Sequence, residues 1–450
     1  MSQKEHIAII GNGISGVTAA RHIRKLSDKK ITIISAETDY FFSRTALMYV
    51  YMGHMEFKHT EPYEPWFWDK NRIELKKGYV ESIDISNKKL LFTNDEEMSF
   101  DKLIIATGSV PNKFGWQGQD AEGVMGMYHK QDLDNLEHHA PNNKVCKRGV
   151  IVGGGLIGVE LAEMLRSRNI PVTFLVRENS FWRGVLPKEE SEMINRHIRE
   201  HHIDLRLNSN LREIKTDENG KVKSIIIDET EEEILCNVVG LTAGVSPNIS
   251  FLKESEIETG KGVKVNRYLE TNISDIYAIG DCAEQREAIG NRRPVEAVWY
   301  TGRMMGETVA QTICGNKMKY NPGHWFNSAK FLDIEYQTYG WVWSTPKENE
   351  KHFYWEHKEG KKAIRINYDK NNHQFIGINT FGIRMRHEFF DDVLNQEKTV
   401  EEVLIHFADA NFDPEFFKLH EKEIINQFNI ENDTNIQLKK KSWKRIFSTT

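Results

Sequence analysis

Short, continuous runs of aliphatic residues alternate with longer amphipathic stretches over the first two thirds of the chain. The runs at 6–10, 31–35, 149–152 and 171–176 are each four to six residues long. Runs of this kind are typical of strands that are buried on both faces of a parallel sheet. The stretches that follow 6–10 and 149–152 have helical spacing instead, with helices expected from about 17 and from 159. This pattern predicts an α/β fold built from strand–helix–strand units.

The pattern changes after about residue 325. FNSAKFLDIEYQTYGWV (326–342), KHFYWEH (351–357) and KKAIRINYD (361–369) alternate between apolar and polar positions. Alternation with a period of two predicts an antiparallel sheet with one face in the core. Residues 388–428 are helical in pattern. We therefore expect a smaller α+β domain at the C-terminal end, followed by a basic tail at 431–450.

Two of the buried runs lead directly into glycine-rich loops of the same type. The first loop is Gly11-Asn-Gly13-Ile-Ser15-Gly16, and the second is Gly153-Gly-Gly155-Leu156-Ile157-Gly158. In such a loop the first glycine permits a tight turn, the second lets the backbone approach a pyrophosphate, and the last lets the helix pack on the strand. The helix N-terminus adds free N–H groups and a partial positive charge. Each loop is therefore predicted to bind a dinucleotide.

An acidic residue strengthens the prediction for the first loop. The strand ITIIS (31–35) is followed by Glu37, which comes 21 residues after Gly16. A carboxylate at this distance is placed to bind a ribose hydroxyl. A structural turn followed by a surface glutamate is the alternative. Two complete units in one chain imply two dinucleotides, as when a nicotinamide reduces a flavin.

Composition sets the class of protein. The chain has 450 residues, enough for two or three domains, and a formal net charge of −6, which argues against a nucleic-acid-binding protein. No apolar run approaches the ~18 residues that span a bilayer, and the first run begins too early for a signal peptide. A cytoplasmic protein is expected. The four cysteines form no CxxC pair, and no metal site is predicted.

Three later stretches identify a family resemblance. KLIIATGSVPN (102–112), GLTAGVSPN (240–248) and DIYAIGDCAE (275–284) resemble motifs of the two-dinucleotide-binding-domain flavoproteins, the pyridine nucleotide-disulfide oxidoreductase superfamily. The resemblance covers about residues 5–345. It implies an FAD-binding domain at 1–112 and 240–320, an NAD(P)-binding domain at 113–239 and a C-terminal domain at 321–430. Both nucleotide-binding domains would be Rossmann-like.

The resemblance also implies roles for individual residues. Asp281 would hydrogen-bond the flavin ribityl chain, and Val80 would lie against adenine. The backbone at Ala106, Thr107 and Gly108 would lie against FAD, and the stretch that ends the nicotinamide domain contains Gly244. PVEAVWYTGRMMGETVA (294–310) resembles the helix whose N-terminus faces the flavin. Glu296, Ala297 and Val298 would then lie near the ring system.

The redox cysteines of the disulfide reductases are absent. The segment that carries such a cysteine pair in those enzymes reads YFFSRTALMYVYMGH (40–54) and contains no cysteine. SRTALMY resembles instead the arginine-containing loop of the ferredoxin and rubredoxin reductases. The resemblance implies that Arg44 and Ser43 pack over FAD, although TALMYVYMG departs from the usual pattern that follows. A surface salt bridge is the alternative role for Arg44.

Residues after the fourth buried run bear on the choice of nicotinamide. Val176 stands where NADH-specific relatives have an acid. Arg177 and Arg183 favour binding of a 2′-phosphate, whereas the negative charge of Glu178 would repel that phosphate. This set slightly favours NADPH. Glu160 matches a family glutamate near the nicotinamide, with a helix-surface glutamate as the alternative. Hydride transfer between stacked rings needs positioning above all, so no catalytic residue is assigned.

The leading functional hypothesis is an FAD-dependent NAD(P)H oxidoreductase that reduces a ferredoxin or a rubredoxin. Two alternatives remain open: a quinone reductase at the inner face of a membrane, and a nicotinamide-sensing signalling protein that changes conformation or forms a homodimer. The quinone alternative depends on QLKKKSWKRIFSTT (437–450), which could contact an anionic membrane weakly. His197 and His201, four apart on a predicted helix, are expected on a solvated helix face. WFW (66–68) is expected in the core or in a lid.

Overall fold

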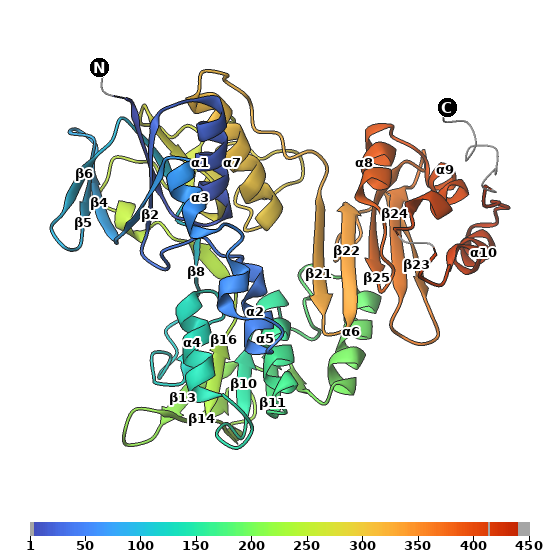
Figure 1. Cartoon of the computed structure of the whole chain (residues 1–450). Helices are drawn as coiled ribbons and strands as arrows, with labels where there is room; N and C mark the ends of the chain where they lie inside the picture. The colour runs from blue at the N-terminus through green and yellow to red at the C-terminus, as the bar shows by residue number, and fades with distance from the viewer. Residues whose placement is uncertain (1–3, 413–414, 440–450) are drawn as a thin grey trace. The chain divides into compact units, whose positions relative to one another are not determined.

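The computed structural model describes residues 4–412 and 415–439 (Figure 1). Its internal contacts divide the chain into two compact units. The first unit contains Met1–Gly153, Met164–Val172 and Leu211–Pro322. The second contains Gly154–Glu163, Thr173–Asn210 and Gly323–Thr450. The expected domain boundaries stay predictions.

The first unit is built around a five-stranded parallel sheet. The strand order is β19-β7-β1-β2-β3, with strands Ile276–Ala278, Lys102–Ile105, His6–Ile10, Lys30–Ser35 and Ile73–Lys77. All four pairings are parallel. Helix α1 (Ile14–Leu26) follows β1 directly, so it begins three residues before the expected Val17 and includes Gly16. Helical geometry starts there because Gly13 already provides the N-cap.

Two helices pack closely on one another beside this sheet. Helix α7 (Trp299–Ile313) contacts α1 along most of its length, as the adjacent ribbons show (Figure 1). A Cβ atom at Gly306 would lie 2.6 Å from the Ser15 carbonyl oxygen, and one at Gly302 would lie 2.6 Å from Ser15 Oγ. The two glycines therefore allow a backbone approach that a larger residue would prevent.

Smaller elements complete this part of the chain. They are helices α2 (Leu47–Tyr51) and α3 (Pro65–Lys70), the antiparallel sheet β4-β5-β6 (Val80–Asp84, Lys89–Phe92, Glu97–Ser99), and the pairs β17–β8 (Val245–Pro247, Ser109–Pro111) and β18–β20 (Val263–Val265, Ala283–Gln285). Helix α3 contains the WFW segment. Trp68 is buried in the core there, whereas Trp66 is exposed.

A second parallel sheet carries the second glycine loop. Its order is β12-β11-β10-β16-β9, with strands Asp204–Leu207, Val172–Val176, Gly149–Val152, Val238–Leu241 and Val124–Met125. The helices of this region are α4 (Lys130–His139), α5 (Leu156–Ser167) and α6 (Lys188–Glu200). An antiparallel sheet β13-β14-β15 (Leu211–Thr216, Val222–Ile227, Glu233–Leu235) follows β12. Helix α5 begins at Leu156, not at Val159 as the sequence pattern predicts.

The C-terminal part confirms the predicted antiparallel sheet. The order is β21-β22-β25-β24-β23, with strands Phe326–Phe331, Ile334–Gly340, Phe375–Phe381, Ala363–Asp369 and Glu350–Glu356. Helices α8 (His387–Asn395), α9 (Val400–Ile405) and α10 (Glu421–Asn432) follow. Their apolar side chains share a core with the sheet.

The predicted tail begins too early. Helix α10 continues to Asn432, and Ile436 is buried in the same core as the sheet. Asn429 Nδ2 donates a hydrogen bond to the Ile436 carbonyl oxygen at 3.0 Å, and this contact ties residues after the helix to the folded part. Residues 440–450, which include most of the predicted membrane-binding segment, lie outside the described residues.

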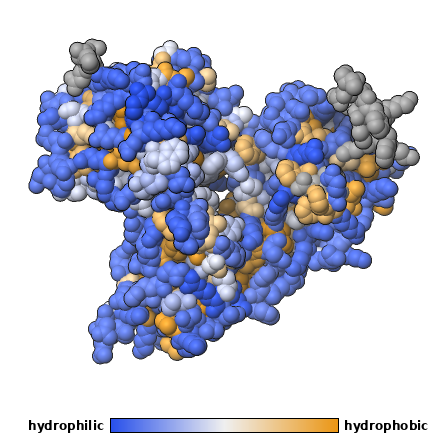
Figure 2. Space-filling view, viewed as in Figure 1, coloured by the Kyte–Doolittle hydropathy of each residue, from blue (hydrophilic) through white to orange (hydrophobic). Residues whose placement is uncertain are grey.

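Exposed apolar side chains are concentrated near the C-terminal helices. Phe412, Phe416, Phe417, Leu419 and Ile430 are each at least 47% exposed. The space-filling view likewise shows hydrophobic residues on the surface of this part, while most of the visible surface is hydrophilic (Figure 2). Among the described residues, no helix combines the length and apolar character that a bilayer crossing needs.

Candidate functional site

The first glycine loop has the geometry that the sequence predicts. Gly11 adopts φ of +117°, and a Cβ atom there would lie 2.1 Å from the Ala106 carbonyl oxygen. A Cβ at Gly16 would lie 2.1 Å from the Gly11 carbonyl oxygen. Gly13 differs from both, because no atom lies within 4 Å of a Cβ placed there. The outer glycines are therefore required for packing, and Gly13 leaves space beside the start of α1.

The N-terminus of α1 is available to an anion. Its N-cap is Gly13, and no side chain caps the helix. The first turn contains no acidic residue. Its backbone N–H groups and the helix dipole can therefore serve a pyrophosphate placed over Gly13. These features fit a dinucleotide phosphate, and a dinucleotide there would be held by the loop Gly11–Gly16.

Glu37 and Arg44 form one ion pair. The Arg44 guanidinium donates to both carboxylate oxygens of Glu37, at 2.9 and 2.6 Å. The Lys130 backbone N–H also donates to Glu37 Oε1, at 2.8 Å. Although burial opposes it, hydrogen bonding from His129 and Arg44 lowers the pKa of Glu37 to about 2. The sequence analysis predicts that these residues contact different parts of FAD, whereas the structure shows that they also bind each other.

Arg44 is also held by aromatic side chains. Its guanidinium carbon lies 4.6 Å from the ring centre of Tyr128 and 5.0 Å from that of Phe42. It donates a further hydrogen bond to the Tyr128 carbonyl oxygen. The guanidinium is consequently fixed between Glu37 and two rings. Arg44 is thus more than a solvent-exposed salt bridge.

Asp281 belongs to a partly buried polar cluster. Ser109 Oγ donates to Asp281 Oδ2 at 3.2 Å, and the Tyr128 hydroxyl lies 3.5 Å from the same oxygen. The Ser109 backbone N–H donates to the Tyr128 hydroxyl at 3.1 Å. Burial raises the pKa of Asp281, and it raises the pKa of Tyr128 to about 12. Sequence reasoning found Asp281 but missed Tyr128 and Ser109.

The other predicted cofactor-binding positions of this region lie in the first unit. Val80 is buried at the start of β4, and Thr107 Oγ1 donates to the Asn248 carbonyl oxygen at 2.7 Å. Gly108 and Gly244 have positive φ values of 68° and 86°. Ser43 Oγ lies 3.4 Å from Thr45 Oγ1. These positions are compatible with the expected roles, which stay predictions.

The segment before α7 places a second ion pair in a buried position. Arg292 Nη1 donates to both carboxylate oxygens of Glu296, at 3.1 and 3.0 Å. Burial raises the pKa of Glu296 despite this arginine. Ala297 is exposed, and Val298 is the N-cap of α7. The predicted flavin-facing residues therefore lie in the turn that leads into the helix.

The second glycine loop repeats the first. Gly153 has φ of +121°, and a Cβ atom there would lie 2.6 Å from the backbone of Thr242. Gly155 corresponds to Gly13, because a Cβ there would have no neighbour within 4 Å. Leu156, Ile157 and Gly158 form the first turn of α5. This loop fits a second pyrophosphate in the same way.

Glu160 lies on α5 beside other charged residues and is partly buried. Burial raises the pKa of Glu160 to about 7, and the negative charge of Glu163 adds to the rise. Lys330 Nζ donates to Glu163 Oε1 at 2.7 Å, so the lysine neutralises Glu163 rather than Glu160. A helix-surface glutamate would not behave in this way. Glu160 therefore carries a proton over part of the range below neutral pH.

Replacing Glu160 with glutamine should remove a pH dependence of stability. The folded state keeps the Glu160 proton up to about pH 7, whereas the unfolded chain releases it near 4.5. The stabilisation is complete below pH 4.5 and is lost as the pH rises through 7. Relative to Glu160→Gln, the wild type should lose up to about 3 kcal/mol in unfolding free energy over this range, at 1.36 kcal/mol per pKa unit.

Denaturant unfolding of both proteins between pH 5 and 8, in steps of about one pH unit, measures this difference. Glu192→Gln, at an exposed position of α6, is the matched control and should follow the wild type. A constant difference between wild type and Glu160→Gln across the range would contradict the assignment.

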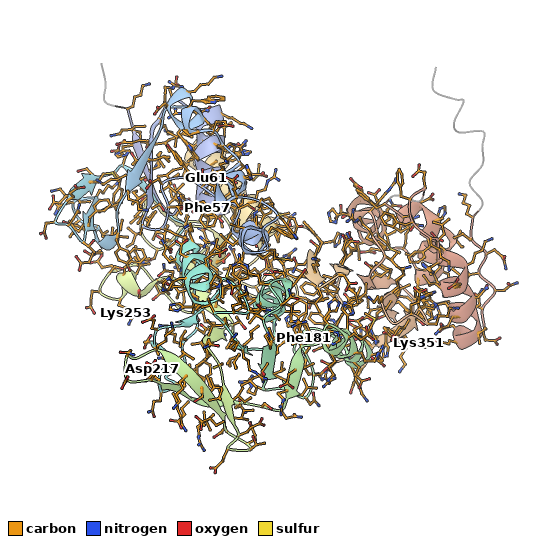
Figure 3. All side chains as sticks on the ribbon, turned by 60° about the horizontal axis from the view of Figure 1, so that its bottom comes forward. Phe57, Glu61, Phe181, Asp217, Lys253 and Lys351 are labelled. Atoms are coloured by element: carbon orange, nitrogen blue, oxygen red, sulfur yellow. The ribbon has the colours of Figure 1, made fainter. Side chains whose placement is uncertain are left out.

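Arg177 and Arg183 make different contacts. Arg177 is 75% exposed and pairs with Glu178 at 2.7 Å. Arg183 Nη1 instead donates to the Ser344 carbonyl oxygen at 3.2 Å. Of these two arginines, only Arg177 has an exposed guanidinium whose partner, a neighbouring carboxylate, a phosphate could replace. Phe181, labelled in Figure 3, comes from the same segment and is fully buried against Phe331.

All four cysteines are free thiols, and three of them are buried. Burial raises the pKa of Cys146 to about 11 and that of Cys236 to about 12. Cys282 is fully buried beside Asp281, and burial raises its pKa as well. Thiols of this kind are inert, because the thiolate is the reactive form.

The expectation for His197 was wrong. His197 is 1% exposed and contacts Asp333, which lies in the turn between β21 and β22. It does not lie on a solvated helix face, because the turn covers this side of α6. The sequence missed Asp333 because 132 residues separate it from His201.

The parallel sheets, the two glycine loops and the partly buried Glu37 beside the first loop define a protein that binds two dinucleotides. The family described as pyridine nucleotide-disulphide oxidoreductase matches residues 5–308, and the chain belongs to this family. The protein is accordingly an FAD-dependent NAD(P)H oxidoreductase, a flavoprotein of electron transfer.

Two curated relatives and one solved structure illustrate the similarity. The chain is 28% identical over 340 residues to an NADH oxidase of Methanocaldococcus jannaschii, covering 73% of this chain and 74% of the relative. It is 31% identical over 338 residues to the 5,5'-dehydrodivanillate O-demethylase ferredoxin reductase subunit of a Sphingobium species, covering 74% and 80%. A ferredoxin reductase from Rhodopseudomonas palustris has the same fold, with a TM-score of 0.79, 20% identity and coverage of 88% and 96%.

Proposed function

We propose that this protein passes electrons from NAD(P)H through FAD to a small redox protein of the ferredoxin or rubredoxin type. The observation that carries the proposal is the segment 40–54, which contains Arg44 and no cysteine. Disulfide reduction needs a thiol pair beside the flavin. Burial raises the pKa of each of the three buried thiols, which disfavours the reactive thiolate. One relative is named as a ferredoxin reductase subunit, and this name agrees with the proposal.

The residues around the first loop would hold FAD by complementary contacts. The α1 N-terminus would bind the pyrophosphate over Gly13, and Glu37 would accept a hydrogen bond from a ribose hydroxyl while keeping Arg44 in place. Asp281 would bind the ribityl chain, with Ser109 fixing the orientation of its carboxylate. Bound FAD supplies the chemistry, by accepting a hydride and releasing electrons singly.

NADPH is the proposed electron donor. The 2′-phosphate would replace Glu178 as the ion-pair partner of Arg177. Because the Arg177 side chain is exposed, its guanidinium can turn toward the phosphate. Arginine pairs phosphate with two parallel hydrogen bonds. Val176 supplies no acid that would select the 2′-hydroxyl of NADH.

Anaerobic stopped-flow reduction of the purified flavoprotein tests the function. NADPH should bleach the flavin absorbance at a rate in the range of enzyme turnover, about 1–1000 per second, and NADH should do so more slowly. Under turnover, a ferredoxin or a rubredoxin should be reduced, whereas a disulfide should not. Fast consumption of oxygen with no reduction of either protein would contradict the proposed acceptor.

Arg177→Ala tests the choice of nicotinamide. The variant should lower kcat/KM for NADPH by about 10- to 100-fold, because the charge-assisted contact with the 2′-phosphate is lost, and leave kcat/KM for NADH unchanged. Arg199→Ala, an exposed arginine on α6, is the control and should alter neither value. Equal loss for both nucleotides would show that Arg177 does not recognise the 2′-phosphate.

A further inference from the structure

A cluster of two histidines and an aspartate lies outside the dinucleotide sites. His197 is in the last turn of α6, and His201 is the C-cap of the same helix. Asp333 comes from the turn between β21 and β22, where Leu332 has φ of +58°. His201 Nε2 lies 3.0 Å from Asp333 Oδ1, and His197 Nε2 contacts the same oxygen. One donor atom from each side chain lies within 4.8 Å of the others.

The buried histidine is not satisfied by the protein. Neither ring nitrogen of His197 makes a hydrogen bond of good geometry, although the side chain is 1% exposed. A buried polar group without a partner costs free energy, about 1–3 kcal/mol by mutational data. His197 plays no part in flavin or nicotinamide binding as described above. Its Nε2 lies close to Asp333 Oδ1 without the geometry of a hydrogen bond, an arrangement that a ligand shared by the two groups would explain.

We propose that His197, His201 and Asp333 form a binding site for a divalent cation of the Zn²⁺ class. Two imidazole nitrogens and one carboxylate oxygen are a donor set that Zn²⁺ and its first-row neighbours prefer, whereas Mg²⁺ and Ca²⁺ prefer oxygen alone. Two histidines four residues apart on a helix present their rings on one face. Water would supply the remaining ligand, because His201 is partly exposed.

Neighbouring charges orient two of the three ligands, His197 and Asp333. Glu200 Oε2 lies 3.7 Å from His197 Nδ1, on the side of the ring away from Asp333. A carboxylate there favours the tautomer with the proton on Nδ1 and leaves Nε2 free to bind a cation. Lys361 Nζ lies 3.1 Å from Asp333 Oδ2, which leaves Oδ1 as the ligand oxygen.

The ligand atoms lie closer together than they would around a bound cation, and His197 Nε2 and Asp333 Oδ1 would have to separate the most. Around a tetrahedral Zn²⁺ with bonds of about 2.0–2.1 Å, ligand atoms lie about 3.3 Å apart. The 3.0 Å separation between His201 and Asp333 would therefore widen by a few tenths of an ångström. A bound cation would then clamp the end of α6 to the β21–β22 turn, both of which belong to the second unit.

Equilibrium dialysis of the chelator-treated holoprotein against Zn²⁺ tests the proposal. One equivalent should bind, and Co²⁺ in its place should give visible ligand-field bands beyond the flavin absorbance. His201→Ala and Asp333→Asn should each weaken binding by at least about 100-fold, and Glu200→Gln should weaken it about 10-fold, as loss of a residue behind a ligand does. The thermal unfolding transition of each variant, compared with that of the wild type, shows that the whole chain has folded.

His202→Asn is the matched control. His202 is exposed beside the cluster and has φ of +58°, a conformation that asparagine tolerates. This variant should bind Zn²⁺ as the wild type does. Two other groups of potential ligands occur among the described residues, Glu122/His138/His139 and His357/His420/Glu423. Binding that survives His201→Ala and Asp333→Asn, or no stoichiometric binding to the wild type, would overturn the proposal.

Discussion

Gly13→Ala should produce a folded protein that is nearly colourless. Gly13 has φ of −73°, which alanine adopts freely, and its Cβ would meet no atom of the protein within 4 Å. The methyl group would instead occupy the space that the pyrophosphate needs in order to approach the α1 backbone. We expect FAD affinity to fall by about 100-fold or more, the equivalent of about 3 kcal/mol. Titration of the apoprotein with FAD measures this loss directly.

Two other glycines separate the cofactor effect from the folding effect. Gly155→Ala should keep the yellow colour and raise the KM for the nicotinamide, because Gly155 has the same open surroundings in the second loop. Gly11→Ala should destabilise the protein itself, because its Cβ would lie 2.1 Å from a backbone oxygen at a φ of +117°. Normal FAD binding by Gly13→Ala, or loss of FAD from Gly155→Ala, would contradict the assignment of the two loops.

The sequence was informative wherever local physics decides the structure. The strands at His6–Ile10 and Gly149–Val152 have the bounds that their aliphatic runs predict. Each glycine loop is encoded in six consecutive residues, because a turn, a phosphate and a helix start impose requirements one after another along the chain. The antiparallel sheet was predicted for the same reason, since alternation is visible within each strand.

Contacts between distant segments could not be predicted in this way. Glu37 and Arg44 were both identified, but their pairing depends on Tyr128 and Lys130, which are more than 80 residues away. Ser109 lies within the motif KLIIATGSVPN, but that motif does not indicate a contact with Asp281, which is 172 residues further along the chain. Tyr128 was missed because it belongs to none of the motifs. The buried His197 looked like a surface residue because its cover, the turn at Asp333, lies far along the chain. A single sequence carries no signal for such pairs.

The same limitation applies to a buried charge in the C-terminal sheet. Arg365 lies on β24, between β25 and β23, and only 2% of its side chain is exposed. Its Nε donates to Glu190 Oε1 at 3.1 Å, and its Nη2 donates to Glu189 Oε2 at 2.6 Å. Asn379 Nδ2 donates to the other oxygen of Glu190 at 2.9 Å. Glu190 is completely buried, so its charge depends on these two partners.

Arg365→Met should destabilise the protein by about 3–5 kcal/mol at pH 8, because it leaves Glu190 buried without a countercharge. Denaturant unfolding with the wild type as reference measures the loss. Arg286→Met removes an exposed ion pair, with Glu258 at 2.6 Å, and should cost no more than about 1 kcal/mol.

Adding Glu190→Met to Arg365→Met should recover much of the loss, since two apolar side chains leave no unpaired charge in the core. Lowering the pH should also favour the Arg365→Met variant, because protonation of Glu190 removes its charge. Burial already raises the pKa of Glu190 in the intact network. If the double variant is as unstable as the sum of the two single variants, then packing of the arginine stem, and not its charge, stabilises this region.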